Sequence, residues 1–282
     1  MSRMYERFAR GDVAVGATIM EHGAEWAEIV GYVGIDYAMI DMKNVSIDWG
    51  HAAELVRACA RYDVTPWVRL QSYPWGGSSE ADPRLPADVF RAIGIGAEVI
   101  TASVNTVEAI EAMLVPVRED NANDYVHTRP YINRPLYMPR DGTVRRDDDR
   151  SGNRWIVPDI ESLEALDNLD AIVGIDGLNG FMLSLADISQ AIGHPFDYRH
   201  PELEAIVRRA TSIAATRGVR VFSFAGGDTP EDVAESARRL WSLGISGWMI
   251  PRMTFAAQRF YERTLRQIED AIPETRLQQE PS

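Results

Sequence analysis

The chain contains two apolar runs that end in carboxylates, Arg154-Trp155-Ile156-Val157-Pro158-Asp159-Ile160-Glu161 and Gly180-Phe181-Met182-Leu183-Ser184-Leu185-Ala186-Asp187. A stretch with helical character, residues 162–173, lies between them. A strand–helix–strand unit of this kind brings two parallel strands side by side with their ends level. Glu161 and Asp187 are therefore expected to converge at one rim of a parallel sheet.

The same alternation of strand and helix continues along the whole chain. The predicted strands are residues 13–20, 37–42, 65–70, 98–102, 154–158, 180–185, 219–224 and 247–251. The predicted helices are residues 24–34, 51–62, 87–94, 106–117, 162–173, 200–218, 229–244 and 254–272. Eight such units predict an α/β fold, a single TIM (β/α)8 barrel domain over residues 1–272. A doubly wound open sheet would alternate similarly, but no G-x-G-x-x-G follows the first strand, which weakens that alternative.

One long segment interrupts the alternation. Residues 118–153 lack apolar periodicity and are rich in Arg, Asp and Asn. Loops of this length inside a compact domain are usually lids or unstructured segments. We interpret residues 118–153 as a loop insertion, which is either a solvated loop or a cap over the site. The polar residues 273–282 are expected to form a flexible C-terminal tail.

Composition excludes several classes of protein. With 45% hydrophobic and 25% charged residues, the chain is typical of a globular protein, and its net charge of -13 argues against nucleic-acid and anionic-membrane partners. The single cysteine, Cys59, excludes a disulfide framework. No apolar run reaches the ~18–20 residues that span a bilayer, and residues 1–12 lack an apolar signal core. We expect a cytoplasmic protein.

Polar side chains gather at the predicted C-terminal ends of the strands, where TIM barrels carry their active sites. These residues are Glu21, His22, Asp41, Lys43, Asn44, Arg69, Gln71, Asp159, Glu161, Ser184, Asp187 and Arg252. Asp159 and Glu161 share one strand face because they are two residues apart. With Asp41 and Asp187 they would make up to four carboxylates around one opening, which favours a bound divalent cation and a contact with Arg69.

Each of these residues also has a purely structural interpretation. A single acid can be an ordinary loop cap, and Arg69 can form a structural ion pair with a rim acid instead of binding an anionic substrate. Lys43 and His22 can be solvated residues at strand ends.

Most of the chain, except residues 118–153, resembles the HpcH/HpaI family of class II pyruvate aldolases. The resemblance is carried by Glu161-Ser162-Leu163-Glu164-Ala165-Leu166-Asp167-Asn168-Leu169-Asp170, Ile175-Asp176-Gly177, Leu185-Ala186-Asp187-Ile188-Ser189 and Ile192-Gly193-His194-Pro195. Weaker matches surround Asp41 and Arg69. The resemblance implies a homo-oligomeric TIM barrel, a trimer or hexamer, whose C-terminal helix is exchanged between subunits.

The resemblance also implies a site. Mg²⁺, Mn²⁺ or Co²⁺ would be held at the positions of Glu161 and Asp187. A small-molecule 2-oxo acid, such as pyruvate or oxaloacetate, would be bound by Arg69 and by the backbone near Ala186 and Asp187. Ser184 and Asp159 are further candidates for substrate contacts.

The chain departs from the family at its acid–base dyad. The Glu-His pair that follows the strand-two Asp in the family is Lys43-Asn44 here, and the position of the partner Asp is Gly94. Asn44 cannot exchange a proton near pH 7. The candidate catalytic residues are therefore Arg69, His22, Lys43 and Asn44.

These features predict a metal-dependent carbon–carbon lyase or carboligase that acts on a 2-oxo acid through a metal-stabilised enolate. Both aldol and decarboxylative chemistry stay open. The alternative is a catalytically weak protein that binds a 2-oxo acid as a sensor or scaffold.

Overall fold

The computed structural model describes residues 2–71, 82–122, 154–250 and 252–272. Most of the predicted loop insertion and the whole predicted tail lie outside the described residues. The strands are β1 (Ala14–Ile19), β2 (Tyr37–Asp41), β3 (Thr65–Arg69), β4 (Val99–Thr101), β5 (Trp155–Ile156), β6 (Asp159–Ile160), β7 (Gly180–Leu183), β8 (Arg220–Phe224) and β9 (Gly247–Ile250). They form one parallel sheet in the order β5-β4-β3-β2-β1-β9-β8-β7-β6.

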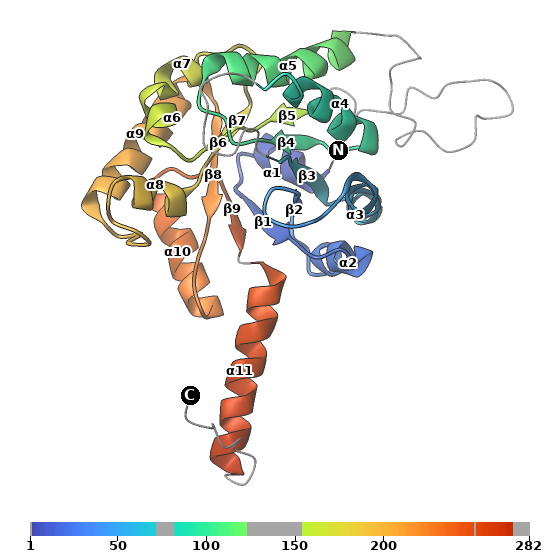
Figure 1. Cartoon of the computed structure of the whole chain (residues 1–282). Helices are drawn as coiled ribbons and strands as arrows, with labels where there is room; N and C mark the ends of the chain where they lie inside the picture. The colour runs from blue at the N-terminus through green and yellow to red at the C-terminus, as the bar shows by residue number, and fades with distance from the viewer. Residues whose placement is uncertain (1, 72–81, 123–153, 251, 273–282) are drawn as a thin grey trace, which may run out of the picture.

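The two ends of this order, β5 and β6, are halves of one interrupted strand. Pro158 has no N–H to donate, so the ladder is interrupted between them. The backbone N–H groups on either side still reach the same neighbour, because Val157 donates to Ile100 (3.0 Å) and Asp159 donates to Ala102 (2.9 Å). Ser103 also bridges to Asp159. The sheet therefore curls into a TIM-like barrel, as predicted (Figure 1).

The helices follow the strands as the sequence predicts, with local differences. They are α1 (Arg3–Ala9), α2 (Ala24–Tyr32), α3 (Trp49–Arg61), α4 (Leu85–Ile95), α5 (Val107–Ala122), α6 (Leu163–Asp167), α7 (Leu169–Val173), α8 (Leu185–Ala191), α9 (Pro201–Arg217), α10 (Pro230–Ser242) and α11 (Met253–Ala271). The sequence did not predict α1 or α8. The predicted helix 162–173 is divided at Asn168 into α6 and α7.

The predicted boundary at residue 118 was wrong, because α5 continues to Ala122. Arg118 is held there by two contacts, one to Glu111 at 2.6 Å and one to the carbonyl oxygen of Asp176 at 2.7 Å. Arg118 therefore has partners that the apolar pattern of the sequence does not reveal.

The barrel interior is filled by large side chains and is closed at its N-terminal end by α1. This helix buries Met4, Tyr5 and Phe8 against the interior of the barrel. Phe8 stacks on the ring of Trp155 at a centroid distance of 5.6 Å. The strands leave room for such rings where they carry glycine, since a Cβ at Gly16 would lie 2.1 Å from the ring of Tyr37. The second and larger core lies between the strands and the surrounding helices.

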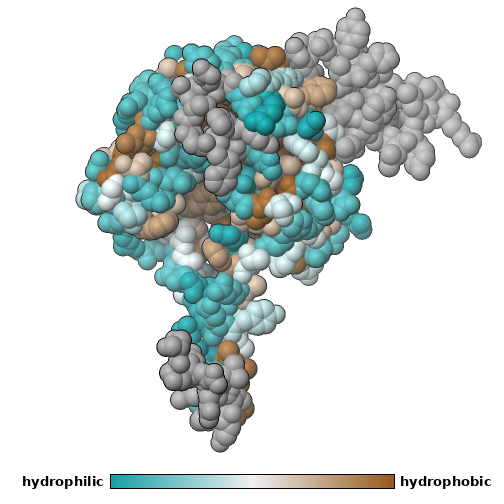
Figure 2. All heavy atoms as spheres, viewed as in Figure 1, coloured by the Kyte–Doolittle hydropathy of each residue, from teal (hydrophilic) through white to brown (hydrophobic). Residues whose placement is uncertain are grey.

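The last helix, α11, extends away from the barrel and has no buried residue (Figure 1). Its exposed apolar side chains include Tyr261, Leu265 and Ile268, whose spacing places them along one face. Brown patches are visible on this helix in Figure 2. An uncovered stripe of this kind is compatible with the expected exchange between subunits, which stays a prediction. None of the helices described is long and apolar enough to cross a membrane.

Candidate active site

The C-terminal strand ends place their polar side chains at one level of the barrel. In the parallel register, Asp41 of β2 is paired with Arg69 of β3, and Arg69 is paired with Thr101 of β4. Ser103 follows β4 and bridges to Asp159, which begins β6. The sequence predicted a rim of acids and Arg69, and the structure brings them together.

Arg69 is the centre of the rim cluster. Its buried guanidinium contacts Asp159 through Nη2 and lies 3.4 Å from Asp41 through Nη1 and 3.7 Å from Glu161. Burial lowers the pKa of Arg69, but the negative charges of Asp159, Asp41 and Glu161 outweigh burial and raise it above its usual value. The Nε–H of Arg69 is buried and has no acceptor among the described residues. An orphan donor of this kind costs about 1–3 kcal/mol, so it marks a position where an anionic oxygen would be favourable.

Asp159 is completely buried beside Arg69. Its Oδ1 accepts a hydrogen bond from the hydroxyl of Ser184 at 2.9 Å. Burial raises the pKa of Asp159 to about 6, although Arg69, Lys43 and Ser184 act in the opposite direction. Both predicted substrate contacts, Asp159 and Ser184, therefore belong to the cluster, where they hold the guanidinium in place.

Lys43 and Glu161 form an ion pair across the rim. The Nζ of Lys43 donates to both carboxylate oxygens of Glu161, at 2.9 and 2.8 Å, and to the hydroxyl of Ser103 at 2.6 Å. The side chains of Lys43 and Glu161 are only 21% and 23% exposed, so solvent screens this pair less than a surface pair. Ser103 was missed by sequence reasoning because its predicted strand stops at residue 102.

Asp41 fixes the turn that follows β2. Its Oδ1 accepts the backbone N–H groups of Lys43 (2.8 Å) and Asn44 (3.0 Å), and its Oδ2 accepts the side-chain amide of Asn44 (2.8 Å). Asn44 is exposed and supports Asp41. In this structure the contacts of Asn44 are those of a turn residue.

Asp187 lies in the first turn of α8, immediately after β7. The residue is exposed, yet partial desolvation and the negative charge of Glu161 raise its pKa. The charge of Asp187 in turn contributes, after burial, to a raised pKa of Tyr198. Tyr198 lies in the loop before α9, which carries no motif that would have identified it. Ala186, adjacent to Asp187, accepts through its carbonyl from Ser189 at 2.7 Å.

His22 makes its contacts away from these carboxylates. Its Nε2 lies 3.2 Å from the carbonyl oxygen of Ser46, and its ring meets the ring of His51 edge to face at 5.0 Å. Gly94 lies within α4, where an added Cβ would meet nothing within 4 Å. His22 therefore contacts none of the rim acids, and position 94 has no side chain that could do so.

The charge of the cluster fits a divalent cation. Four carboxylates, those of Asp41, Asp159, Glu161 and Asp187, face the two cations Arg69 and Lys43. Two negative charges are then uncompensated when all groups are ionised, which agrees with the raised pKa values of Asp159 and Asp187. Carboxylate oxygens are the ligands that Mg²⁺ and Mn²⁺ prefer. The donor set at Glu161 and Asp187 fits such an ion, provided that Lys43 releases Glu161.

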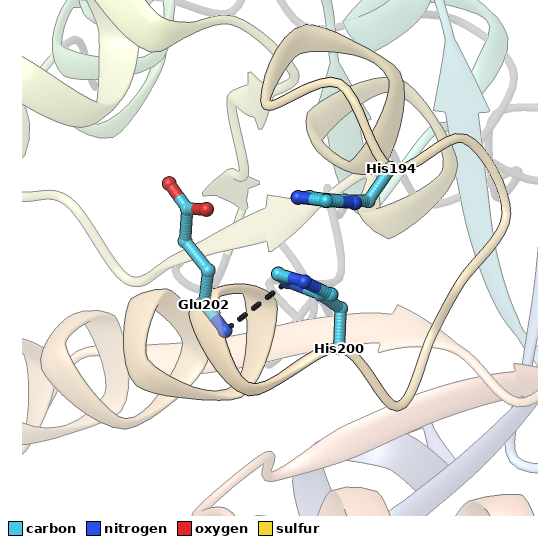
Figure 3. Close-up of side chains that lie close together, drawn as sticks. All are labelled: His194, His200 and Glu202. Carbon is cyan, nitrogen blue, oxygen red and sulfur yellow. Dashed lines mark hydrogen bonds between the residues drawn. The ribbon is translucent and has the colours of Figure 1, made fainter.

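A second group of possible ligands lies in the loop before α9 and in the first turn of that helix (Figure 3). The ligand atoms of His194, His200 and Glu202 lie within 4.8 Å of one another, and no other triad in the described part of the chain is so close. The two imidazole rings are stacked, with their centroids 3.5 Å apart and an angle of 18° between their planes. Their nitrogen lone pairs lie in these planes and are therefore nearly parallel instead of converging on one point. His200 also accepts the backbone N–H of Glu202 at its Nδ1 (3.3 Å). This geometry is that of a helix cap and is unfavourable for one shared ion.

Comparisons with known proteins agree with this architecture. A family model described as HpcH/HpaI aldolase/citrate lyase matches residues 20–251. No curated protein gives a significant match. The HpcH/HpaI aldolase from Desulfitobacterium hafniense DCB-2 is 18% identical, with a TM-score of 0.75 and 100% of both chains covered.

Two further solved structures are similar at comparable identity. Citrate synthase SbnG is 19% identical with a TM-score of 0.71, covering 95% of this chain and 98% of its own. Macrophomate synthase is 16% identical with a TM-score of 0.75, covering 98% of this chain and 90% of its own. At these identities the similarities demonstrate a shared fold.

Proposed function

The chain belongs to the HpcH/HpaI aldolase/citrate lyase family, and from this membership we propose that it is a carbon–carbon lyase or carboligase acting on a 2-oxo acid such as oxaloacetate. The observation that carries the proposal is the rim cluster, in which a buried guanidinium with an unused donor lies among four carboxylates. The substrate is a small anion, which Arg69 and a divalent cation would attract.

We assign the cation to Glu161 and Asp187. A Mg²⁺, Mn²⁺ or Co²⁺ ion bound there would supply a Lewis acid for the keto oxygen of the substrate. Asp159 and Asp41 contact Arg69 and therefore position it, and the hydroxyl of Ser184 orients Asp159.

Arg69 would stabilise negative charge that develops on the substrate. Its guanidinium is fixed by two carboxylates, so it requires little reorganisation during the reaction. The free Nε–H can donate to the oxygen of an enolate as that oxygen gains charge. The positive charge is permanent, because the neighbouring acids hold the pKa of Arg69 above its usual value.

We favour a decarboxylative route because the resemblance places Lys43, Asn44 and Gly94 at the positions where the family has its acid–base dyad. In a 3-carboxylated 2-oxo acid, the bond between C3 and its carboxylate breaks, CO₂ leaves, and the electron pair forms the enolate across C2 and C3. This step needs no protein base. Asn44 has no group that titrates near neutral pH, and its side-chain amide donates to Asp41. The enolate then takes a proton from water or attacks an electrophile, which gives decarboxylase or carboligase activity.

We also propose that the protein is a homo-oligomer, a trimer or hexamer, in which α11 packs on a neighbouring subunit. The support is the uncovered apolar stripe of Tyr261, Leu265 and Ile268. A helix without a single buried residue gains little stability from its own subunit.

The test is metal-dependent turnover of oxaloacetate, followed as pyruvate release with Mg²⁺ and with EDTA. Glu161→Gln is expected to lose metal-dependent turnover. The matched control is Glu164→Gln, which changes an exposed acid three residues away on α6. This control should retain metal-dependent turnover. Full activity of Glu161→Gln in EDTA would disprove the metal assignment. Binding of oxalate without any turnover or pyruvate methyl exchange in D₂O would favour the sensor or scaffold alternative.

A further inference from the structure

Lys43 is the only lysine in the 282-residue chain, in which every other side chain of the Lys and Arg class is arginine. This single ammonium lies on the carboxylate of Glu161 at the rim of the barrel. An ammonium has three N–H donors, and the three acceptors around Lys43 are the two oxygens of Glu161 and the hydroxyl of Ser103. All its donors are therefore used.

The position of Lys43 is fixed from its backbone. Asp41 accepts the backbone N–H of Lys43 at 2.8 Å, which holds the turn after β2. Asn44 supports the same aspartate through its side chain. The two residues at the dyad positions thus act together, because Asn44 stabilises the turn and Lys43 extends from it to Glu161.

A cation that binds Glu161 needs the same oxygen lone pairs that Lys43 uses. Divalent cations bind carboxylate oxygens at about 2.0–2.6 Å, whereas the ammonium lies 2.8 and 2.9 Å from the two oxygens. Two cations cannot both take the bidentate position, since they would lie within a few ångströms of each other and repel.

We propose that Lys43 is an internal competitor for the divalent cation, holding Glu161 when no cation is bound and releasing at least one of its oxygens when a cation binds. This inference rests on the proposed function, in which Glu161 is a cation ligand. Lys43 is then a positioning residue that keeps the partly buried carboxylate of Glu161 paired in the metal-free protein and lowers the affinity for the cation. The released ammonium keeps its contact with Ser103 as an available anchor.

The first measurement is the affinity for Mn²⁺ alone, by calorimetry. Lys43→Met is expected to bind Mn²⁺ about tenfold or more tightly, as loss of a charge-assisted hydrogen-bond pair implies. Lys43→Arg, which keeps the charge and the competition, should stay near the wild type. Ser103→Ala removes the acceptor that the released ammonium would keep, so it should bind Mn²⁺ no more tightly than the wild type. Unchanged or weaker binding by Lys43→Met would overturn the inference.

The second measurement observes Lys43 directly. Labelling the protein with [¹³C]lysine gives one lysine spin system, whose Cε–Hε signal should shift when Mg²⁺ is added. Tighter binding by Lys43→Met without any shift of this signal would indicate a general charge effect and would refute direct competition.

Glu161→Gln separates this inference from the proposed function. If that variant binds Mn²⁺ as the wild type does, the ligand assignment itself fails. If it loses Mn²⁺ but Lys43→Met gains no affinity, only the competition fails.

Discussion

Replacing Arg69 by lysine keeps a positive charge but removes the planar fork that the rim requires. The guanidinium reaches Asp41 with Nη1 and Asp159 with Nη2, while its Nε–H stays free. These acceptors lie on different strands, β2 and β6. A single ammonium on a flexible stem cannot reproduce this arrangement. Arg69→Lys therefore tests whether the fork itself matters.

Two losses are expected from this change. At least one buried charge-assisted hydrogen bond disappears, which is worth about 1.5–3 kcal/mol of stability. The donor available to a developing oxyanion disappears as well, and removal of one such donor typically costs ~10²–10³ in rate. We therefore expect a free energy of unfolding about 2 kcal/mol lower and a kcat/KM at least ~10²-fold lower.

The assays are urea unfolding and steady-state oxaloacetate turnover at saturating Mg²⁺. The control is Arg209→Lys, whose ion pair to Asp170 joins side chains that are 52% and 70% exposed. This control should change stability by less than about 0.5 kcal/mol and leave kcat/KM unchanged. If Arg69→Lys lowers stability but retains near-wild-type kcat/KM, the role of Arg69 is structural. If stability is also unchanged, the buried network is not as described.

Three further predictions concern other parts of the molecule. Ser184→Ala removes a hydrogen bond that favours ionised Asp159, so it should lower the free energy of unfolding by about 1.5–3 kcal/mol at pH 8. This loss should become smaller as the pH falls through about 6, where Asp159 becomes protonated in the folded protein. An equal loss at pH 5 and pH 8 would contradict the prediction. His22→Ala should retain turnover within about tenfold, because a true general base contributes ~10²–10⁴ and His22 contacts Ser46 instead of the rim acids. Deleting residues 253–282 should reduce the mass measured by light scattering to that of a smaller assembly, and an unchanged assembly would exclude α11 from the interface.

The interior of the barrel shows why some elements escaped prediction. The short helix α1 has only seven residues, too few to establish a helical period from sequence alone. Its position is decided by burial, since Tyr5 donates to the carbonyl oxygen of Glu98 and Phe8 stacks on Trp155. These partners lie more than ninety residues away in the chain, beyond the reach of local patterns.

At the rim, too, some features follow from the local sequence and others depend on residues far apart in the chain. Strand ends are local features, so the sequence could place Asp41, Arg69 and Asp159 at one level of a parallel sheet. Which side chain contacts which partner depends on the closure of the barrel. The pairing of Lys43 with Glu161 joins residues 118 positions apart. Only the folded arrangement could show that His22 points to Ser46 while Lys43 reaches the carboxylate.

The sequence by itself determined the α/β alternation, the barrel and the family, because hydrophobic periodicity and strand-end motifs are encoded over short stretches. The tertiary structure alone decided the interruption at Pro158, the plug formed by α1 and the ion pair between Lys43 and Glu161. The physical reason is the distance along the chain between the residues that interact. Backbone propensity and periodicity act between neighbours in the chain, whereas burial and charge act between residues that only the closed barrel brings together.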